Sequence, residues 1–166
     1  PEERRTEGLI GGKSVSFNIN LPFLEALRIS NWLPLLSQKE AKKITLEIIR
    51  KLQIKTAGTE AGIMSLSGGN QQKVVIGKWL TRQPTLFIMD EPTRGVDVGA
   101  RAEIYKIIRE MSDEGKSFIV ISSDIEELPG LCDRVIVMVR GKISGQLVNE
   151  QITKDALLWL SYADVK

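Results

Sequence analysis

Two stretches decide the fold of this chain: Leu66-Ser67-Gly68-Gly69-Asn70-Gln71-Gln72 and Leu86-Phe87-Ile88-Met89-Asp90-Glu91-Pro92. In the first stretch, a serine stands where a helix would be capped, and two glycines follow in the predicted first helical turn. The free N–H groups of such a turn and the helix dipole favour an anion, and glycines let a phosphate approach the backbone closely. A plain serine cap with flexible glycines would explain the same residues about equally well, because such caps are common.

The second stretch is typical of a buried apolar strand that ends in two adjacent carboxylates, Asp90 and Glu91. Parallel sheets hold ligands at the carboxyl ends of their strands, so Asp90 is a candidate Mg²⁺ ligand and Glu91 a candidate to polarise an attacking water. A charged turn that closes a strand is the usual explanation of an isolated Asp-Glu pair. One amphipathic helix, from about Gly68 to Leu80, separates the two stretches, and together they are more specific than either alone.

The first half of the chain is predicted to be mostly helical. Residues 1–36 have the composition of irregular structure, with a short helix expected after Pro22. Ser37 and Glu40 form a capping box that opens a long amphipathic helix.

The second half alternates strands and helices. Both continuous apolar runs, residues 86–89 and 118–121, are predicted to be strands buried on both faces. This alternation predicts an α/β fold: a mostly parallel sheet with a C-terminal antiparallel hairpin, joined to an α-helical subdomain. The other predicted elements are a helix over residues 98–111 that stops at Gly115, a short helix with Ile125 and Leu128, a hairpin turn at Arg140-Gly141 and a last helix over 154–162.

Composition excludes several classes of function. The chain has 166 residues, a formal net charge of +2, no histidine and a single cysteine, Cys132. There is therefore no histidine base, no histidine-ligated metal, no internal disulfide and no basis for a structural zinc site. The near-balanced charge predicts no nucleic-acid partner, and no apolar run is long enough to predict a membrane span. Cys132 is expected to pack as a small apolar residue.

The ordered series of motifs over residues 63–147 resembles the ATP-binding cassette (ABC) ATPases. Residues 66–72 are similar to their signature motif, with Asn70 where glutamine is usual. Residues 86–91 are similar to their Walker B strand and the catalytic glutamate that follows it, and residues 95–97 resemble the D-loop. Residues 70–74 and 91–101 further resemble sugar importers of the ribose, galactose and xylose kind, which fuse two cassettes in one chain.

Within that subgroup, the chain resembles the second cassette. The resemblance implies that residues 1–82 form the glutamine-loop region and a helical subdomain that ends in the signature helix. Residues 83–166 would form the Walker B half of the α/β nucleotide-binding core. Phe17, Leu21, Phe23 and Trp32 are candidate contacts with a permease, although an internal core explains such residues more simply.

The resemblance also implies a role for each matching residue. Glu91 would be catalytic, and Asp90 and Glu2 would serve Mg²⁺. Two cassettes of this family meet head to tail, so the signature turn of this chain would complete the ATP site of its partner cassette. The residues expected to contact nucleotide are Ser67, Gly68, Gly69, Asn70, Asp97 and Ser123.

Three departures from the family pattern stand out. No phosphate-binding loop G-x-x-x-x-G-K-[ST] is present, because Glu7 stands where the first glycine would precede Gly12-Lys13-Ser14. Ser123 replaces the switch histidine, and with Glu126 it also forms a capping-box pattern. Glu2 replaces the glutamine of the glutamine loop. We therefore expect a cassette that lacks its N-terminal third and is inactive on its own.

The resemblance implies the ATP-binding subunit of a sugar importer, which uses ATP and Mg²⁺ to drive carbohydrate uptake from the cytoplasmic face of a bacterial membrane. Its partners would be a second cassette, a transmembrane sugar permease and, indirectly, a periplasmic sugar-binding protein. The alternative function is a non-catalytic interaction module that docks on a partner cassette or a permease.

Overall fold

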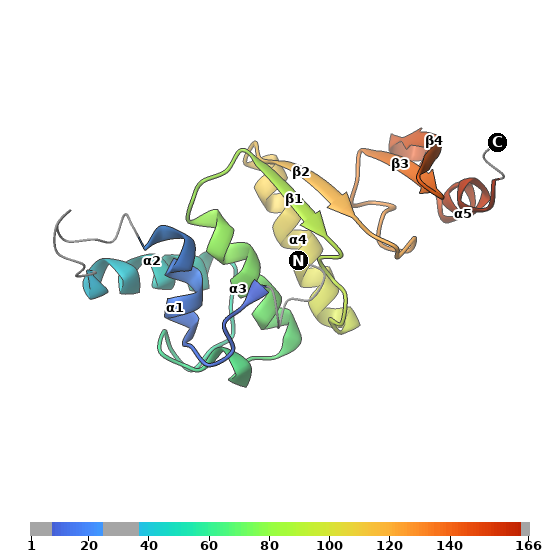
Figure 1. Ribbon diagram of the computed structural model, residues 1–166. Helices are drawn as coiled ribbons and strands as arrows, with labels where there is room; N and C mark the ends of the chain where they lie inside the picture. The colour runs from blue at the N-terminus through green and yellow to red at the C-terminus, as the bar shows by residue number, and fades with distance from the viewer. Residues whose placement is uncertain (1–7, 25–36, 164–166) are drawn as a thin grey trace. The chain divides into compact units, whose positions relative to one another are not determined.

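The computed structural model describes residues 8–24 and 37–163, which fall into two compact units, Pro1–Val120 and Ile121–Lys166 (Figure 1). Within the described residues, no helix combines the length and the apolar character that a membrane span would need. The predicted division of the chain between residues 82 and 83 stays a prediction.

Helices α1, α2 and α3 of the first unit pack on one another, and α3 also packs against α4. Their shared core is aliphatic, and Val15, Ile19, Ile63 and Val74 in it are fully buried. The elements of this unit are α1 (Val15–Asn20), the 3-10 turn η2 (Leu21–Phe23), α2 (Gln38–Lys51), the 3-10 turn η3 (Ile63–Ser65), α3 (Gly68–Leu80), β1 (Leu86–Asp90), α4 (Val98–Asp113) and β2 (Ser117–Ile121), of which only the last residue, Ile121, is counted with the second unit.

The predicted starts of the long helices are confirmed. Ser37 is the N-cap of α2, and its side chain accepts a hydrogen bond from the Glu40 N–H at 3.3 Å. Helix α3 covers the predicted residues. Helix α4 runs two residues further than predicted, and Gly115 follows it with a φ of +88°. That left-handed conformation is one that glycine adopts without steric cost, so it ends the helix.

Helix α1 corrects the prediction that residues 1–36 are irregular before Pro22. Ser14 caps it by accepting from the Phe17 N–H at 3.2 Å. Asn18 and Asn20 lie on its buried side, where a sequence pattern expects apolar residues. The Asn20 side-chain amide donates to Thr45 Oγ1 at 2.8 Å, and Asn18 bonds the backbone of Ile10. These bonds offset the desolvation of the Asn18 amide and of the Asn20 NH₂ group, whereas the buried Asn20 Oδ1 has no hydrogen-bond partner.

Strands β1 and β2 pair, and their arrows point the same way in Figure 1, as the intervening α4 crossover requires. Phe87 and Phe118 stack on one side, with ring centroids 5.2 Å apart. The prediction of strands buried on both faces is wrong, because the side chains that alternate with these phenylalanines are exposed. Their exposed fractions are 47% for Leu86, 68% for Ile88, 50% for Ile119 and 50% for Ile121.

The second unit is a hairpin covered by a helix. Strands β3 (Arg134–Val139) and β4 (Lys142–Val148) pair antiparallel, and α5 (Lys154–Tyr162) packs on them. The predicted two-residue turn is confirmed: Arg140 and Gly141 have φ of +50° and +79°, the left-handed pair that suits a tight hairpin. The core comprises Leu128, Val135, Ile152 and Leu157, with Cys132 packed against it as predicted.

The prediction of a short helix around Ile125 and Leu128 is wrong. The segment forms turns, because its N–H groups bond to nearby side chains: Asp124 N–H donates to Ser122 Oγ at 3.0 Å, and Glu126 N–H donates to Asp124 Oδ1 at 3.1 Å. Serine and aspartate side chains compete with helical bonding in this way.

The two faces of β1 predict a sharp contrast in stability. Phe87→Ala should lower the free energy of unfolding by about 3–5 kcal/mol, because it removes a buried stacked ring. Ile88→Thr is the matched control, which keeps a β-branched residue at an exposed position and should change stability by about 0.5 kcal/mol or less. Urea unfolding of dilute protein measures both. Equal losses would show that the Ile88 face is covered in solution.

Candidate functional site

The turn that opens α3 is held by side-chain hydrogen bonds of its own. Ser67 occupies the N-cap position, yet its side chain does not cap the helix. Instead its Oγ accepts from Asn70 Nδ2 at 2.9 Å, and Asn70 Oδ1 accepts from the Lys55 N–H at 2.7 Å. The first-turn N–H groups of α3 are thus left without a side-chain cap, which suits an anion-binding helix start.

Gly69 has a packing role that the sequence did not reveal. A Cβ placed there would lie 2.4 Å from the Ala100 Cβ and 3.8 Å from Val96 Cγ1. Real side chains never approach so closely, so any larger residue would push α3 away from α4. Glycine at this position therefore sets the distance between the two helices.

Asp97 begins α4 beside this contact. It is the N-cap residue, and its Oδ1 accepts from the Ala100 N–H at 2.9 Å. Because Ala100 also meets Gly69, the signature turn and the start of α4 lie next to each other. The structure thus brings together Ser67, Asn70 and Asp97 from two separate motifs, and their nucleotide contacts stay predictions.

Lys73 is a site residue that sequence reasoning missed. Its side chain is only 3% exposed, and its ammonium donates to Glu103 Oε2 at 2.8 Å and to the Gln53 carbonyl at 3.2 Å. The hydrogen bond from Lys73, and then its positive charge, lower the pKa of the Glu103 carboxyl. A buried lysine among polar neighbours is visible only in the fold, because charged residues are mostly exposed.

Gln71 ties the same helix to the segment before it. Its side chain is 1% exposed, and its Nε2 donates to the Leu66 carbonyl at 3.0 Å. The turn that holds Ser67 is therefore anchored from its N-terminal side as well.

Asp90 and Glu91 stand where β1 ends, as predicted. Asp90 is exposed, and Glu91 is half-buried with a φ of +46°, a left-handed conformation that is uncommon for residues other than glycine. The Arg94 N–H bonds the Glu91 carbonyl at 3.2 Å, which starts the turn toward α4. Strained backbone at a carboxylate is a common feature of functional sites.

A magnesium ion here would need oxygens from its substrate. Among the described residues, no group of three or more acidic, cysteine or histidine side chains could hold a metal. One exposed carboxylate at a strand end nevertheless fits Mg²⁺, because this ion keeps several waters and binds phosphate oxygens with one or two carboxylates. Asp90 has this chemistry, and its metal role stays a prediction.

The other two predicted site residues are placed differently. Ser123 is exposed and belongs to the second unit. The helix that its predicted capping box would start does not form, and the Glu126 N–H donates to Asp124 instead. Glu2 lies outside the described residues.

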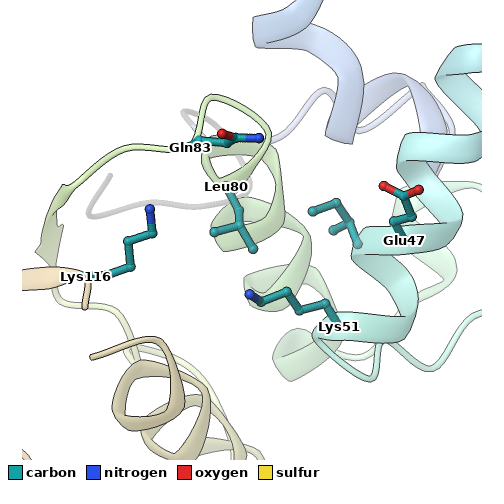
Figure 2. Close-up of a pocket in the computed structure, with 6 residues that line it drawn as sticks. Glu47, Lys51, Leu80, Gln83 and Lys116 are labelled. Carbon is teal, nitrogen blue, oxygen red and sulfur yellow. The ribbon is translucent and has the colours of Figure 1, made fainter. Parts of the chain in front are cut away.

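A cavity of about 310 Å³ lies elsewhere in the first unit (Figure 2). Lys51, which pairs with Glu114 at 2.5 Å, contributes to its wall. None of the predicted site residues lines this cavity, so it is separate from the candidate site. The lining residues are Glu47, Ile48, Lys51, Leu80, Gln83 and Lys116.

Comparison with known proteins agrees with these motifs. A family model described as "ABC transporter" matches residues 6–94, more than half of the chain. The galactose/methyl galactoside import ATP-binding protein MglA of Clostridium perfringens (strain SM101 / Type A) is 44% identical over 160 residues, 96% of this chain and 31% of that protein. The ribose import ATP-binding protein RbsA of Chelativorans sp. (strain BNC1) is 45% identical over 163 residues, 98% of this chain and 32% of that protein. The chain therefore spans about a third of the length of the curated relatives it matches.

The fold has solved counterparts as well. The ATP-binding cassette MJ1267 in its ADP conformation matches with a TM-score of 0.71 and 26% identity, over 89% of this chain and 60% of that one. The predicted α/β fold and the predicted resemblance to sugar-import ABC ATPases are both confirmed.

The Gly69 contact can be tested by compensation. Gly69→Ala should destabilise the protein by about 1–3 kcal/mol, because the added methyl overpacks the contact with Ala100. Adding Ala100→Gly should restore part of that loss by reopening the space. Urea unfolding of the two single variants and the double variant measures the coupling. Additive losses would mean that the two residues do not meet.

The Lys73–Glu103 pair predicts a pH dependence of stability. Since Lys73 lowers the pKa of Glu103 in the folded protein, the stabilisation is fully present above the ordinary glutamate value of about 4.3 and disappears as the pH falls through the lowered pKa. The stability difference between wild type and Glu103→Gln should therefore shrink in that acid range. Glu110→Gln, on the same helix, is the control. A pH-independent difference would contradict the pairing.

Proposed function

Since the chain belongs to the ABC transporter family, we propose that it is part of the ATP-binding subunit of a sugar importer. The observation that carries the proposal is the contact between α3 and α4, where Gly69 packs on Ala100. This contact sets the signature turn beside Asp97, in a unit that also holds the Asp90-Glu91 strand end. The names of the curated relatives refer to the import of galactose, methyl galactoside or ribose, and this supports a sugar as the cargo.

The signature turn is proposed to bind ATP held by a facing cassette. Its uncapped N–H groups and the Ser67 hydroxyl are donors, and phosphate oxygens accept hydrogen bonds. Gly68, Gly69 and Asn70 complete this turn, and Asp97 lies beside it. In this arrangement the chain supplies one wall of a site whose phosphate-binding loop comes from another cassette.

The Asp90-Glu91 pair is proposed to serve hydrolysis. Magnesium bound with ATP would neutralise charge on the phosphates, and Asp90 would hold it directly or through water. Glu91 would orient and polarise the water that attacks the γ-phosphate. Ser123 and Glu2 remain proposed nucleotide and metal contacts.

The proposed partners follow from this function. They are a second cassette in the same parent protein, a transmembrane sugar permease and a sugar-binding protein outside the membrane. The chain would work at the cytoplasmic face of a bacterial membrane. Phe17, Leu21 and Phe23 are half-buried in the structure, and their contact with a permease stays a prediction, while Trp32 lies outside the described residues.

One observation favours the second function, a docking module. The β1–β2 sheet exposes four aliphatic side chains on one face, and the largest exposed fraction is 68%, at Ile88. Exposed aliphatic side chains that share one face of a sheet are common where proteins bind partners. A purified chain that binds the partner cassette without any effect on its ATP hydrolysis would support this function instead.

The ATP-site proposal predicts the effect of one substitution. Ser67→Arg, in the importer subunit assembled with its permease, should lower ATP hydrolysis at least about tenfold, because a bulky side chain fills the position of the phosphate. Ser112→Arg, at an exposed serine near the other end of α4, is the matched control and should keep its activity. Hydrolysis of Mg-ATP is the measurement. Undiminished activity of Ser67→Arg would count against the signature role.

A further inference from the structure

Asn70 has a side-chain amide whose orientation is determined by its partners. The Lys55 backbone N–H can only donate, so the group that faces it at 2.7 Å must be the amide oxygen. The amide NH₂ then faces Ser67 Oγ at 2.9 Å. Asn70 therefore bridges the loop that follows α2 and the serine that precedes α3.

This bridge determines what the Ser67 hydroxyl can do. Its oxygen accepts a hydrogen bond from Asn70, and it makes no bond to the first turn of α3. The hydroxyl hydrogen is thus directed away from Asn70 and is left to donate to a ligand. A phosphate oxygen needs such a donor, and an acceptor at the same place would repel it.

The frame around Asn70 is fixed at a second point. Lys73, one helical turn later, donates to the Gln53 carbonyl at 3.2 Å and to Glu103 on α4 at 2.8 Å. The loop over residues 53–55 is therefore tied twice to α3, once through each of these side chains. Because Lys73 is buried and paired, the loop holds the Lys55 N–H in place for Asn70.

We propose that Asn70 is a positioning residue that sets the Ser67 hydroxyl as a hydrogen-bond donor to a nucleotide phosphate held by the facing cassette. The inference rests on the proposed ATP-site function, which it deepens. Asn70 acts through Ser67, and its short side chain reaches the Lys55 N–H while its NH₂ faces the serine. Substitutions that reverse the polarity of this NH₂ should therefore act like loss of the serine hydroxyl.

Asn70→Asp tests the proposal with little change of shape. The carboxylate still accepts from the Lys55 N–H, but it can no longer donate to Ser67, so the hydroxyl turns to donate to the carboxylate. In the importer subunit with its permease, Asn70→Asp and Ser67→Ala should each lower kcat/KM for Mg-ATP about tenfold. The double variant should be no worse than Ser67→Ala alone, because both changes remove the same donor.

Several outcomes separate the two proposals. An NMR spectrum of the purified chain should show the Lys55 amide still protected from exchange in Asn70→Asp, which excludes a local unfolding effect. Multiplied losses in the double variant, or full activity of Asn70→Asp, would overturn the positioning role while Ser67→Ala upholds the ATP site. Wild-type kcat/KM of Ser67→Ala would overturn both proposals. Asn70→Gln keeps an NH₂ group on a longer side chain, and it should retain wild-type activity only where this NH₂ reaches Ser67. Wild-type activity of Asn70→Gln with an unprotected Lys55 amide would also count against the bridge.

Discussion

The close approach of α3 and α4 is the constraint on which the candidate site depends. Gly69 and Ala100 meet with no room for one more carbon atom, so the distance between the helices is set by backbone and a single methyl group. Packed interiors transmit such a contact rigidly, because they have few voids that could absorb a shift. The contact therefore fixes the signature turn and the N-cap of α4 as neighbours, although they come from separate motifs.

Buried polar groups hold the helices around this contact. The Asn20 amide, the Thr45 hydroxyl and the Lys73 ammonium each lie out of solvent and each has hydrogen-bond partners. Such groups are costly to bury alone, but directional bonds allow one arrangement of their helices and penalise others. The helical part of the first unit is thus specified by polar pairing as well as by aliphatic packing.

The sheets of both units leave apolar side chains uncovered. In the first unit, only one face of the β1–β2 sheet is covered, and exposed apolar side chains lie on the other face. In the second unit, Ile136 and Met138 on β3 are also exposed, by 47% and 65%. Apolar strands in α/β proteins are normally covered on both sides. The described residues of each unit therefore present an apolar sheet face that a partner surface would stabilise.

Local signals in the sequence were sufficient for several elements. The Arg140-Gly141 turn, the Ser37 cap, the Gly115 stop and the span of α3 each depend on interactions within about one helical turn or one tight loop, so nearby residues determine them. The motifs that indicate the family are likewise short and ordered. Their residue types and spacing are enough to identify Ser67, Asp90 and Glu91 as candidates, and the resemblance to the family adds Asp97.

Other features depend on residues far apart in the chain, and no local pattern contains them. Helix α1 escaped prediction because its buried face carries asparagines, whose partners come from the 8–10 segment and α2. The exposed face of β1 was missed because an apolar run does not show what covers it. The partner of the Ser67 hydroxyl and the pairing of Lys73 exist only after residues 53–55, α3 and α4 have come together. Tertiary contact decided these, since each joins groups that are neighbours in space and not in sequence.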